Sequence, residues 1–125
     1  MKKLNLIFLF SIIFFAAIGQ NQFSEASKAT AKKQIEVYRD RVVKGEKMED
    51  IARQYSEDPG SSAKGGLYDN VGIGVMDPAF EKIAFSLKQG QVSQVFETPY
   101  GYHFIQLVRV HGKLRDLRHV LIIPK

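Results

Sequence analysis

Four short motifs between Tyr55 and Ile105 carry most of the information about the fold and function of this chain. They read YSEDPGSSAKGGL at residues 55–67, GIGVMDPAFE at 72–81, LKQGQVS at 87–93 and TPYGYHFI at 98–105. The first is a turn-rich loop, the second places a Met and a Phe four residues apart, and the last places a His on an alternating strand. In this order the motifs predict an apolar pocket with a few polar groups at its rim.

The residues on the N-terminal side of these motifs predict two helices. Residues 24–45 have apolar side chains at steps of three and four, Ser24 can cap the start of this helix, and Gly45 can end it. Residues 47–55 predict a second, shorter helix with its apolar residues turned inward. The Asp-Pro-Gly-Ser-Ser cluster at 58–62 must then be a loop.

After Gly65 the pattern is mainly that of strands. Segments that alternate, or that are rich in β-branched and aromatic residues, predict strands at 67–71, 92–97, 102–110 and 117–123. A helix is expected from Asp77 to Leu87, with Asp77 as its cap and Pro78 at its first position. Together the elements predict an α+β domain in which helices pack on one face of a small antiparallel sheet.

Residues 1–19 have the three parts of a secretory signal peptide. Two lysines form the positive start, residues 4–17 form an apolar run, and Ala17 and Gly19 are the small residues of a cleavage site. The alternative is a membrane anchor, which needs a longer run of about 20 apolar residues. The sequence therefore predicts a periplasmic or secreted protein that keeps no stable membrane anchor and has room for one small domain.

The composition excludes several classes of protein. The chain contains no cysteine, so it has no disulfide, no thiolate nucleophile and no lipid-modified cysteine. Its formal net charge is +5, and removal of Lys2 and Lys3 with the signal leaves +3. That modest excess, together with export, argues against a nucleic-acid partner.

The motifs of common enzyme classes are absent or weak. None of the serines lies in a Gly-x-Ser-x-Gly elbow. His103, His111 and His119 are spaced eight residues apart without a His-x-x-x-His pair on a helix, so a metal site has weak support. A paired-carboxylate mechanism stays open, although neighbouring acids such as Glu57 and Asp58 more often cap or turn a loop.

The motifs closely resemble those of parvulin-type peptidyl-prolyl cis-trans isomerases, in particular the SurA-like periplasmic members. The resemblance rests on the runs at 56–61, 65–67, 76–80, 87–93 and 100–103, and it covers about residues 28–110. It implies a parvulin (FKBP-like) fold, in which helices cover a small four-stranded antiparallel sheet. It also implies rotation about X-Pro bonds, with unfolded or extended proline-containing polypeptides of the periplasm as substrates.

This chemistry suits the residues available. Rotation about an amide must overcome a barrier of about 18–20 kcal/mol, because the C–N bond has partial double-bond character. No covalent bond has to break, so a catalyst can hold the proline ring in an apolar pocket while a hydrogen bond or local field favours the twisted amide. Such a site needs no metal and no cofactor.

The resemblance also gives roles to individual residues. Met76 and Phe80 match the residues that hold the proline ring, and Leu67 matches a third wall of the pocket. Plain core packing is the alternative for a Met and a Phe at this spacing. Asp58 matches a position, either an acid or a Cys in the family, that polarises the surroundings of the substrate carbonyl. Its alternative role is that of a turn-forming residue before Pro59.

Two histidines face one another across the central strands in this family, and they tune the hydrogen bonds behind the site. His103 matches the second of them, while Thr98 and Tyr100 match positions at the rim of the site. The first histidine belongs to a strand of the form x-His-Ile-Leu that precedes the first helix. In this chain residues 20–27 precede the first helix, and they contain no such strand.

Residues 118–125, which read RHVLIIPK, look like the missing strand. We therefore expect residues 20–112 to form a parvulin-like domain without its usual first strand. Residues 113–125 either fill the vacant slot or begin a second parvulin domain of a longer tandem protein. Our hypothesis is that His119 supplies the first histidine, either in cis or from a neighbouring chain by strand exchange. Strand exchange would give a homo-oligomer.

A non-catalytic function also fits the sequence. The same groove suits a chaperone or binding module that holds unfolded envelope proteins and turns over X-Pro bonds slowly or not at all. The sequence does not separate this function from that of an isomerase.

Overall fold

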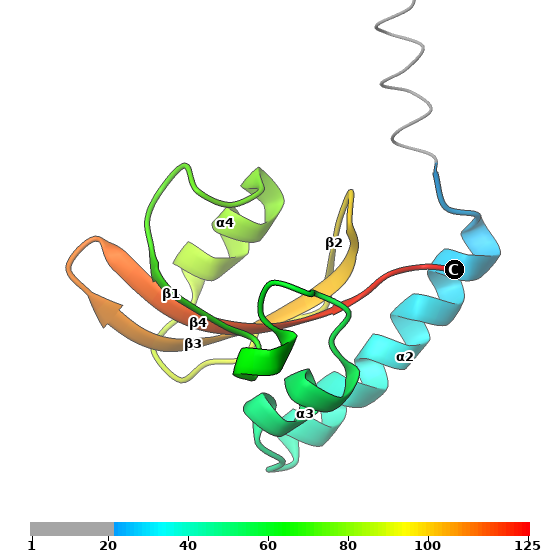
Figure 1. Ribbon diagram of the computed structural model, residues 1–125, viewed down its shortest axis with the longest axis horizontal. Helices are drawn as coiled ribbons and strands as arrows, with labels where there is room; N and C mark the ends of the chain where they lie inside the picture. Colours follow the sequence, from blue (N-terminus) through cyan, green and yellow to red (C-terminus); the bar gives the residue numbers. More distant parts are fainter. Residues whose placement is uncertain (1–21) are drawn as a thin grey trace, which may run out of the picture.

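Helices come first in the described part of the chain, a further helix lies between the first strand and the second, and three strands follow it (Figure 1). The computed structural model describes residues 22–125, so the predicted signal peptide lies outside the described residues. The elements are α2 (Glu25–Val43), α3 (Met48–Tyr55), the 3₁₀ helix η1 (Ser62–Lys64), β1 (Leu67–Val71), α4 (Pro78–Ser86), β2 (Phe96–Thr98), β3 (Gly101–His111) and β4 (Leu114–Ile122). Within residues 22–125, no helix has both the length and the apolar character needed to cross a membrane.

Side-chain caps start two of the helices, as the sequence predicted. The Ser24 hydroxyl accepts a hydrogen bond from the backbone N–H of Ser27 at the start of α2, at 3.1 Å. The Asp77 carboxylate accepts one from the backbone N–H of Ala79 at 2.9 Å, and Pro78 is the first residue of α4. Each cap satisfies a backbone donor that has no partner inside its helix.

The four strands form one antiparallel sheet in the order β1-β4-β3-β2. The α+β fold class and the four-stranded sheet are therefore confirmed. β4 comes last in the sequence but lies in the centre of the sheet, between β1 and β3. The connection from β3 is a two-residue turn in which Gly112 has a φ of +60°, as expected for the first central residue of a type II′ hairpin turn.

Two predicted strands had wrong bounds. The strand expected at 92–97 is shorter and later, because only Phe96–Thr98 pairs regularly with β3. Around Ser93 the ladder is irregular, since the Ser93 hydroxyl takes the place of a backbone acceptor for the N–H of Ile105, at 2.9 Å. The strand expected at 117–123 starts at Leu114, because the tight turn brings Leu114 directly opposite His111.

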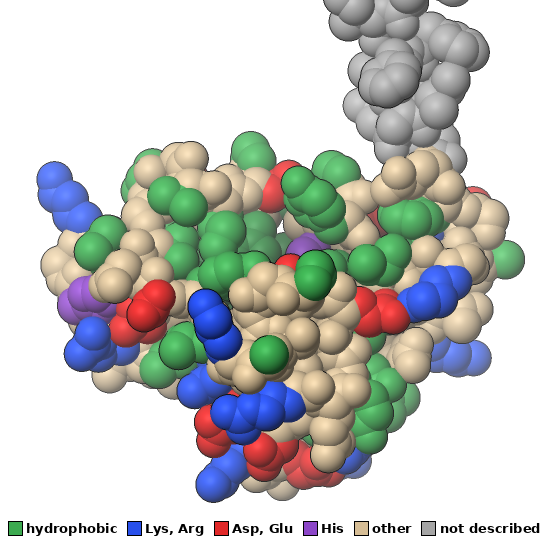
Figure 2. All heavy atoms as spheres, viewed as in Figure 1, with side chains coloured by type: hydrophobic (Ala, Val, Ile, Leu, Met, Phe, Trp, Pro, Cys, Tyr) green, Lys and Arg blue, Asp and Glu red, His purple; other side chains and the backbone are tan. Residues whose placement is uncertain are grey.

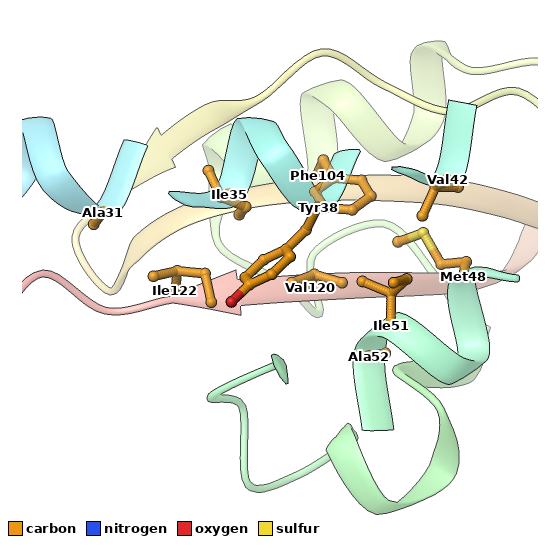
Figure 3. Packing of buried hydrophobic residues seen from close by; sticks show 10 residues of the cluster. All are labelled: Ala31, Ile35, Tyr38, Val42, Met48, Ile51, Ala52, Phe104, Val120 and Ile122. Atoms are coloured by element: carbon orange, nitrogen blue, oxygen red, sulfur yellow. The ribbon is translucent and has the colours of Figure 1, made fainter. Parts of the chain in front are cut away.

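The helices cover both faces of the sheet, which corrects the prediction that they pack on one face. α2 and α3 lie on one side, and α4 lies on the other (Figure 1). Alternate residues of β4 point to opposite sides: Val120 packs with α2 and α3, whereas Leu117 packs with α4. The α2 and α3 side is the larger core (Figure 3), formed by Ala31, Ile35, Tyr38, Val42, Met48, Ile51, Ala52, Phe104, Val120 and Ile122.

The loop after α3 continues the pairing of β4 beyond the end of β1. The backbone N–H of Glu57 donates to the carbonyl of Leu121 at 2.7 Å, and the N–H of Leu121 donates to the Ser56 hydroxyl at 3.1 Å. Nearer β1, the N–H of His119 donates to the carbonyl of Gly66 at 3.0 Å. β4 is therefore hydrogen-bonded along both edges, as a central strand requires.

Gly66 provides a test of this close packing. Its φ is +79°, and an added Cβ would collide with the carbonyl oxygen of His119 and lie 3.0 Å from the Ala52 Cβ. We expect Gly66→Ala to lower the free energy of unfolding by about 3 kcal/mol or more, because strain and collision add. Gly74 is the control, since its φ is +88° but nothing lies within 4 Å of an added Cβ. Gly74→Ala should cost only about 1–2 kcal/mol. Urea unfolding measures both, and equal losses would contradict the packing argument.

Candidate functional site

A cavity of about 410 Å³ opens between α4, the end of β4 and the loop that follows α3. Figure 2 shows hydrophobic side chains gathered around a hollow on this face of the molecule. Residues from distant parts of the sequence line the cavity. Among the predicted site residues, those that line it are Asp58, Met76, Phe80, Thr98, Tyr100, His103 and His119.

Leu67 does not line this cavity, and the neighbouring Tyr68 does. The reason is the register of β1, which pairs Leu67 with Arg118 and Tyr68 with Leu117. Because successive side chains of a strand point to opposite faces, Tyr68 shares the α4 side with Leu117, whereas Leu67 is on the other side. The assignment of Leu67 as a pocket wall is corrected accordingly.

Aromatic rings form the floor and one wall of the cavity. Phe80 is buried on α4, and its ring meets the rings of His103 and His119 edge-on, with centroids 5.7 and 5.2 Å apart. Phe96 of β2 stacks on His103 at 5.3 Å. Met76, half-buried just before α4, also lines the cavity. The arrangement offers an apolar surface on which a small ring or an aliphatic side chain can pack. The contacts among the rings hold this surface in place.

The two histidines are diagonal neighbours on the central strands. In the register of β3 with β4, His119 lies opposite Ile105, two residues from His103 and on the same face. Their rings stack with centroids 5.7 Å apart, and the two Nδ1 atoms are 3.5 Å apart. Both side chains are buried.

The Asp58 carboxylate sets the direction of the hydrogen bonds behind the cavity. A carboxylate only accepts, so the hydroxyls of Ser61 and Tyr68 donate to Asp58 Oδ2, each at 2.6 Å. His119 Nε2 lies 2.8 Å from the same oxygen and must carry the proton.

When both histidines are neutral, the hydrogen bond to Asp58 also determines where the other protons of the chain lie. His119 Nδ1 is then an acceptor, so His103 Nδ1 donates to it. His103 Nε2 in turn accepts from the Thr98 hydroxyl at 2.6 Å, and Thr98 Oγ1 accepts the N–H of Tyr100 at 3.2 Å. A single chain of donors thus runs from the cavity rim to the Asp58 anion.

Burial and this chain of donors shift the pKa values of three groups. Hydrogen bonds from His119, and then from Ser61 and Tyr68, hold the pKa of Asp58 well below its usual range in spite of burial. Burial, followed by the repulsion of His119, lowers the pKa of His103 to about 3. Burial and the Asp58 anion raise the pKa of Tyr68 to about 12. The site therefore keeps a fixed anion, a neutral His103 and a neutral Tyr68 across the physiological range.

Sequence reasoning did not assign Ser61, which donates to Asp58, to the site. It also left unassigned the lining residues Glu57, Pro59, Tyr68, Asp77, Leu121 and Ile123. Ser61 lies three residues after Asp58, a spacing at which its hydroxyl can donate a hydrogen bond to the carboxylate across a turn. The sequence therefore contained the information needed to predict this contact. Tyr68 could not be chosen over Leu67 without the strand register. In the described part of the chain, no group of three or more His, Cys, Asp or Glu side chains is arranged to hold a metal ion.

Known proteins are similar to this chain in sequence. Residues 13–109 match the family described as rotamase, PPIC-type PPIASE domain. Chaperone SurA of Chromobacterium violaceum is 49% identical over 87 residues, which cover 70% of this chain and 19% of that protein. Foldase protein PrsA of Bacillus subtilis is 42% identical over 90 residues, which cover 72% of this chain and 31% of that protein. The chain thus spans less than a third of the length of either relative.

Solved structures are similar as well, and one of them serves as the example. It is the crystal structure of peptidylprolyl isomerase PrsA from Bacillus cereus, which has a TM-score of 0.48 and 31% sequence identity. The similarity covers 78% of this chain and 31% of that one.

The lowered pKa of His103 predicts a pH dependence of stability. In the unfolded chain this residue takes up a proton near pH 6.5, but in the folded chain it does so only near pH 3. Between these values the unfolded state binds one more proton, so the free energy of unfolding should fall by about 1.4 kcal/mol for each pH unit of acidification. Urea unfolding between pH 4 and pH 7 measures this slope.

His103→Gln is the matched variant, because an amide does not titrate in this range. Its slope should be smaller than that of the wild type by about one proton. Below about pH 5 Asp58 adds to the slope of both proteins, because its ordinary pKa is about 3.9 and its folded value is lower, and this contribution cancels when the two slopes are compared. Equal slopes for the two proteins would show that folding does not lower the pKa of His103.

Proposed function

Because the chain belongs to the family of PPIC-type peptidyl-prolyl isomerase (rotamase) domains, we propose that it catalyses cis-trans isomerisation of X-Pro bonds in exported, incompletely folded polypeptides. The observation that carries the proposal is the apolar cavity over the buried pair of His103 and His119, with the Asp58 anion beside it. The names of the two relatives, a chaperone and a foldase, support a role in the folding of other proteins. The predicted signal peptide supports action outside the cytoplasm.

The cavity favours the twisted amide in two ways. A planar amide gains part of its stability from a charge-separated form with negative charge on the carbonyl oxygen, and rotation loses this form. An apolar cavity solvates the charge-separated form less well than water does, and a fixed anion such as Asp58 near the carbonyl opposes it further. Each 1.4 kcal/mol by which the planar form is disfavoured relative to the twisted form raises the rate about tenfold.

The surrounding residues keep these groups in place. Phe80 and Met76 bind the proline ring and let the rest of the peptide turn about the bond. His119 holds the Asp58 carboxylate, and His103 holds the Thr98 hydroxyl at the rim. With a pKa of about 3, His103 is a poor proton donor or acceptor near neutral pH, so its role is to position neighbouring groups.

We also propose that β4 completes the site within one chain. His119 lies on this strand, beyond the residues that match the family. The two-residue turn at Gly112 and Lys113 returns the chain directly beside β3, and strand exchange would require this turn to open. A second parvulin domain that begins at His119 would need the same strand for its own sheet.

A non-catalytic chaperone is the second candidate. Its support is the exposure of Ile73, Val75 and Tyr100, because Tyr100 lines the cavity and Val75 directly precedes Met76. Exposed apolar residues beside a pocket suit the binding of unfolded chains. A wild-type protein that prevents aggregation of an unfolded client, but does not accelerate X-Pro exchange, would favour this function.

Removal of the Met76 side chain tests the proposed ring-binding surface. We expect Met76→Ala to lower kcat/KM for an Ala-Pro peptide about tenfold, because the ring loses apolar contact worth about 1.4 kcal/mol. The melting temperature should change little, since Met76 is only half-buried. NMR exchange spectroscopy of the peptide measures the rate. Val37→Ala, at an exposed site on α2, is the control, and an equal loss there would contradict the assignment.

The role of β4 predicts the behaviour of a shortened chain. Deletion of residues 114–125 should unfold the domain, since it removes the central strand and the buried His119. A shortened chain with unchanged melting and unchanged rate would refute the proposal. Circular dichroism and the peptide assay give both readouts.

Mixing two inactive chains separates assembly in cis from strand exchange. His103→Ala and His119→Ala chains, unfolded and refolded together, should stay inactive, because each site takes both histidines from one chain. Exchange of β4 would place an intact His103 beside an intact His119 in half of the sites of a mixed dimer. Recovery of activity on mixing would therefore contradict assembly in cis.

A further inference from the structure

The charged side chains around the cavity are of one sign. Apart from the two histidines, the lining residues that carry charge are Glu57, Asp58 and Asp77. Two of these acids are already used by the fold. Asp58 accepts the hydrogen bonds from His119, Ser61 and Tyr68, and Asp77 caps α4. Glu57 is the acid whose function the fold does not fully explain.

One oxygen of the Glu57 carboxylate is fixed, and the other binds a cation. Oε1 accepts the backbone N–H of Ile123 at 2.7 Å, which holds the carboxylate at the edge of the cavity. Oε2 pairs with the ammonium group of Lys125. The carboxylate is therefore oriented for a cation before any peptide binds.

The cation that occupies this position is replaceable. The Lys125 side chain is 72% exposed, whereas that of Glu57 is 31% exposed. Exposed ion pairs are weak, so a peptide cation can take the place of Lys125 at small cost. The N–H of Ile123 remains bound to Oε1 during such an exchange, so the wall of the cavity does not have to move.

We propose that Glu57 is a specificity-determining residue that binds the side chain of a lysine or arginine next to the substrate proline, in place of Lys125. This proposal rests on the proposed function, since it assumes that the cavity receives the proline. A peptide with an acidic neighbour meets Glu57, Asp58 and Asp77 without a compensating charge. The substrates are then exported chains in which basic residues flank proline.

Peptides that differ only beside proline test the proposal. The set has Lys, Ala or Glu either directly before or directly after the proline, and both binding and isomerisation are measured by NMR. We expect one of the two Lys peptides to bind about threefold to fivefold more tightly than its Ala counterpart, and the Glu peptide to bind more weakly. The preference should largely disappear in about 0.5 M sodium chloride, because the pair is partly exposed.

Two variants assign the preference to Glu57. Glu57→Gln keeps an oxygen for the N–H of Ile123 but loses the charge, so it should bind Lys and Ala peptides equally. Lys125→Gln removes the competing cation and should increase the preference for Lys. A preference that persists in Glu57→Gln, or that is missing in the wild type at low salt, overturns the proposal.

The two proposals fail in different ways. If the Ala-Pro peptide is isomerised but no charge preference exists, only the role of Glu57 is wrong. If no peptide is isomerised but Lys peptides still bind more tightly through Glu57, the isomerase function is wrong and the charge specificity belongs to a binding module.

Discussion

The pairing of β4 along both of its edges is the constraint on which the rest of the structure depends. β3 occupies one edge, and the other edge is shared by β1, Gly66 and the loop that follows α3. This pairing fixes the register, and the register decides which side chains face α4 and which face α2. His119 and His103 meet over the cavity for that reason, and Val120 and Phe104 meet in the larger core.

A half-buried anion, Asp58, orders the polar half of the site, much as β4 orders the sheet. Because Asp58 only accepts hydrogen bonds, His119 Nε2 must carry a proton, and when both histidines are neutral this orders the remaining protons as far as Thr98. The loop that carries Asp58 also holds β4 through Ser56 and Glu57. Backbone pairing and side-chain electrostatics thus reinforce one another at a single loop.

Local signals in the sequence were sufficient for much of the fold and part of the site. Caps such as Ser24 and Asp77 depend on residues within one turn of a helix, so the sequence predicts them well. The choice between Leu67 and Tyr68 depends on which residue of β4 lies opposite, about 50 residues later. The placement of α4 on the far side of the sheet likewise depends on packing between distant segments, which periodicity alone does not encode.

The order of the elements along the chain also has a consequence for folding. α2 and α3 carry seven of the ten residues of the larger core, and their apolar partners Phe104, Val120 and Ile122 lie on the last two strands. During synthesis from the N-terminus, both helices are complete more than 40 residues before β3 begins, so they have no sheet to cover them. Cooperative folding must therefore wait for the β3–β4 hairpin, because the core partners of both helices are distant in the sequence. A nascent chain with this order of elements keeps the apolar faces of both helices uncovered until the β3–β4 hairpin has been made.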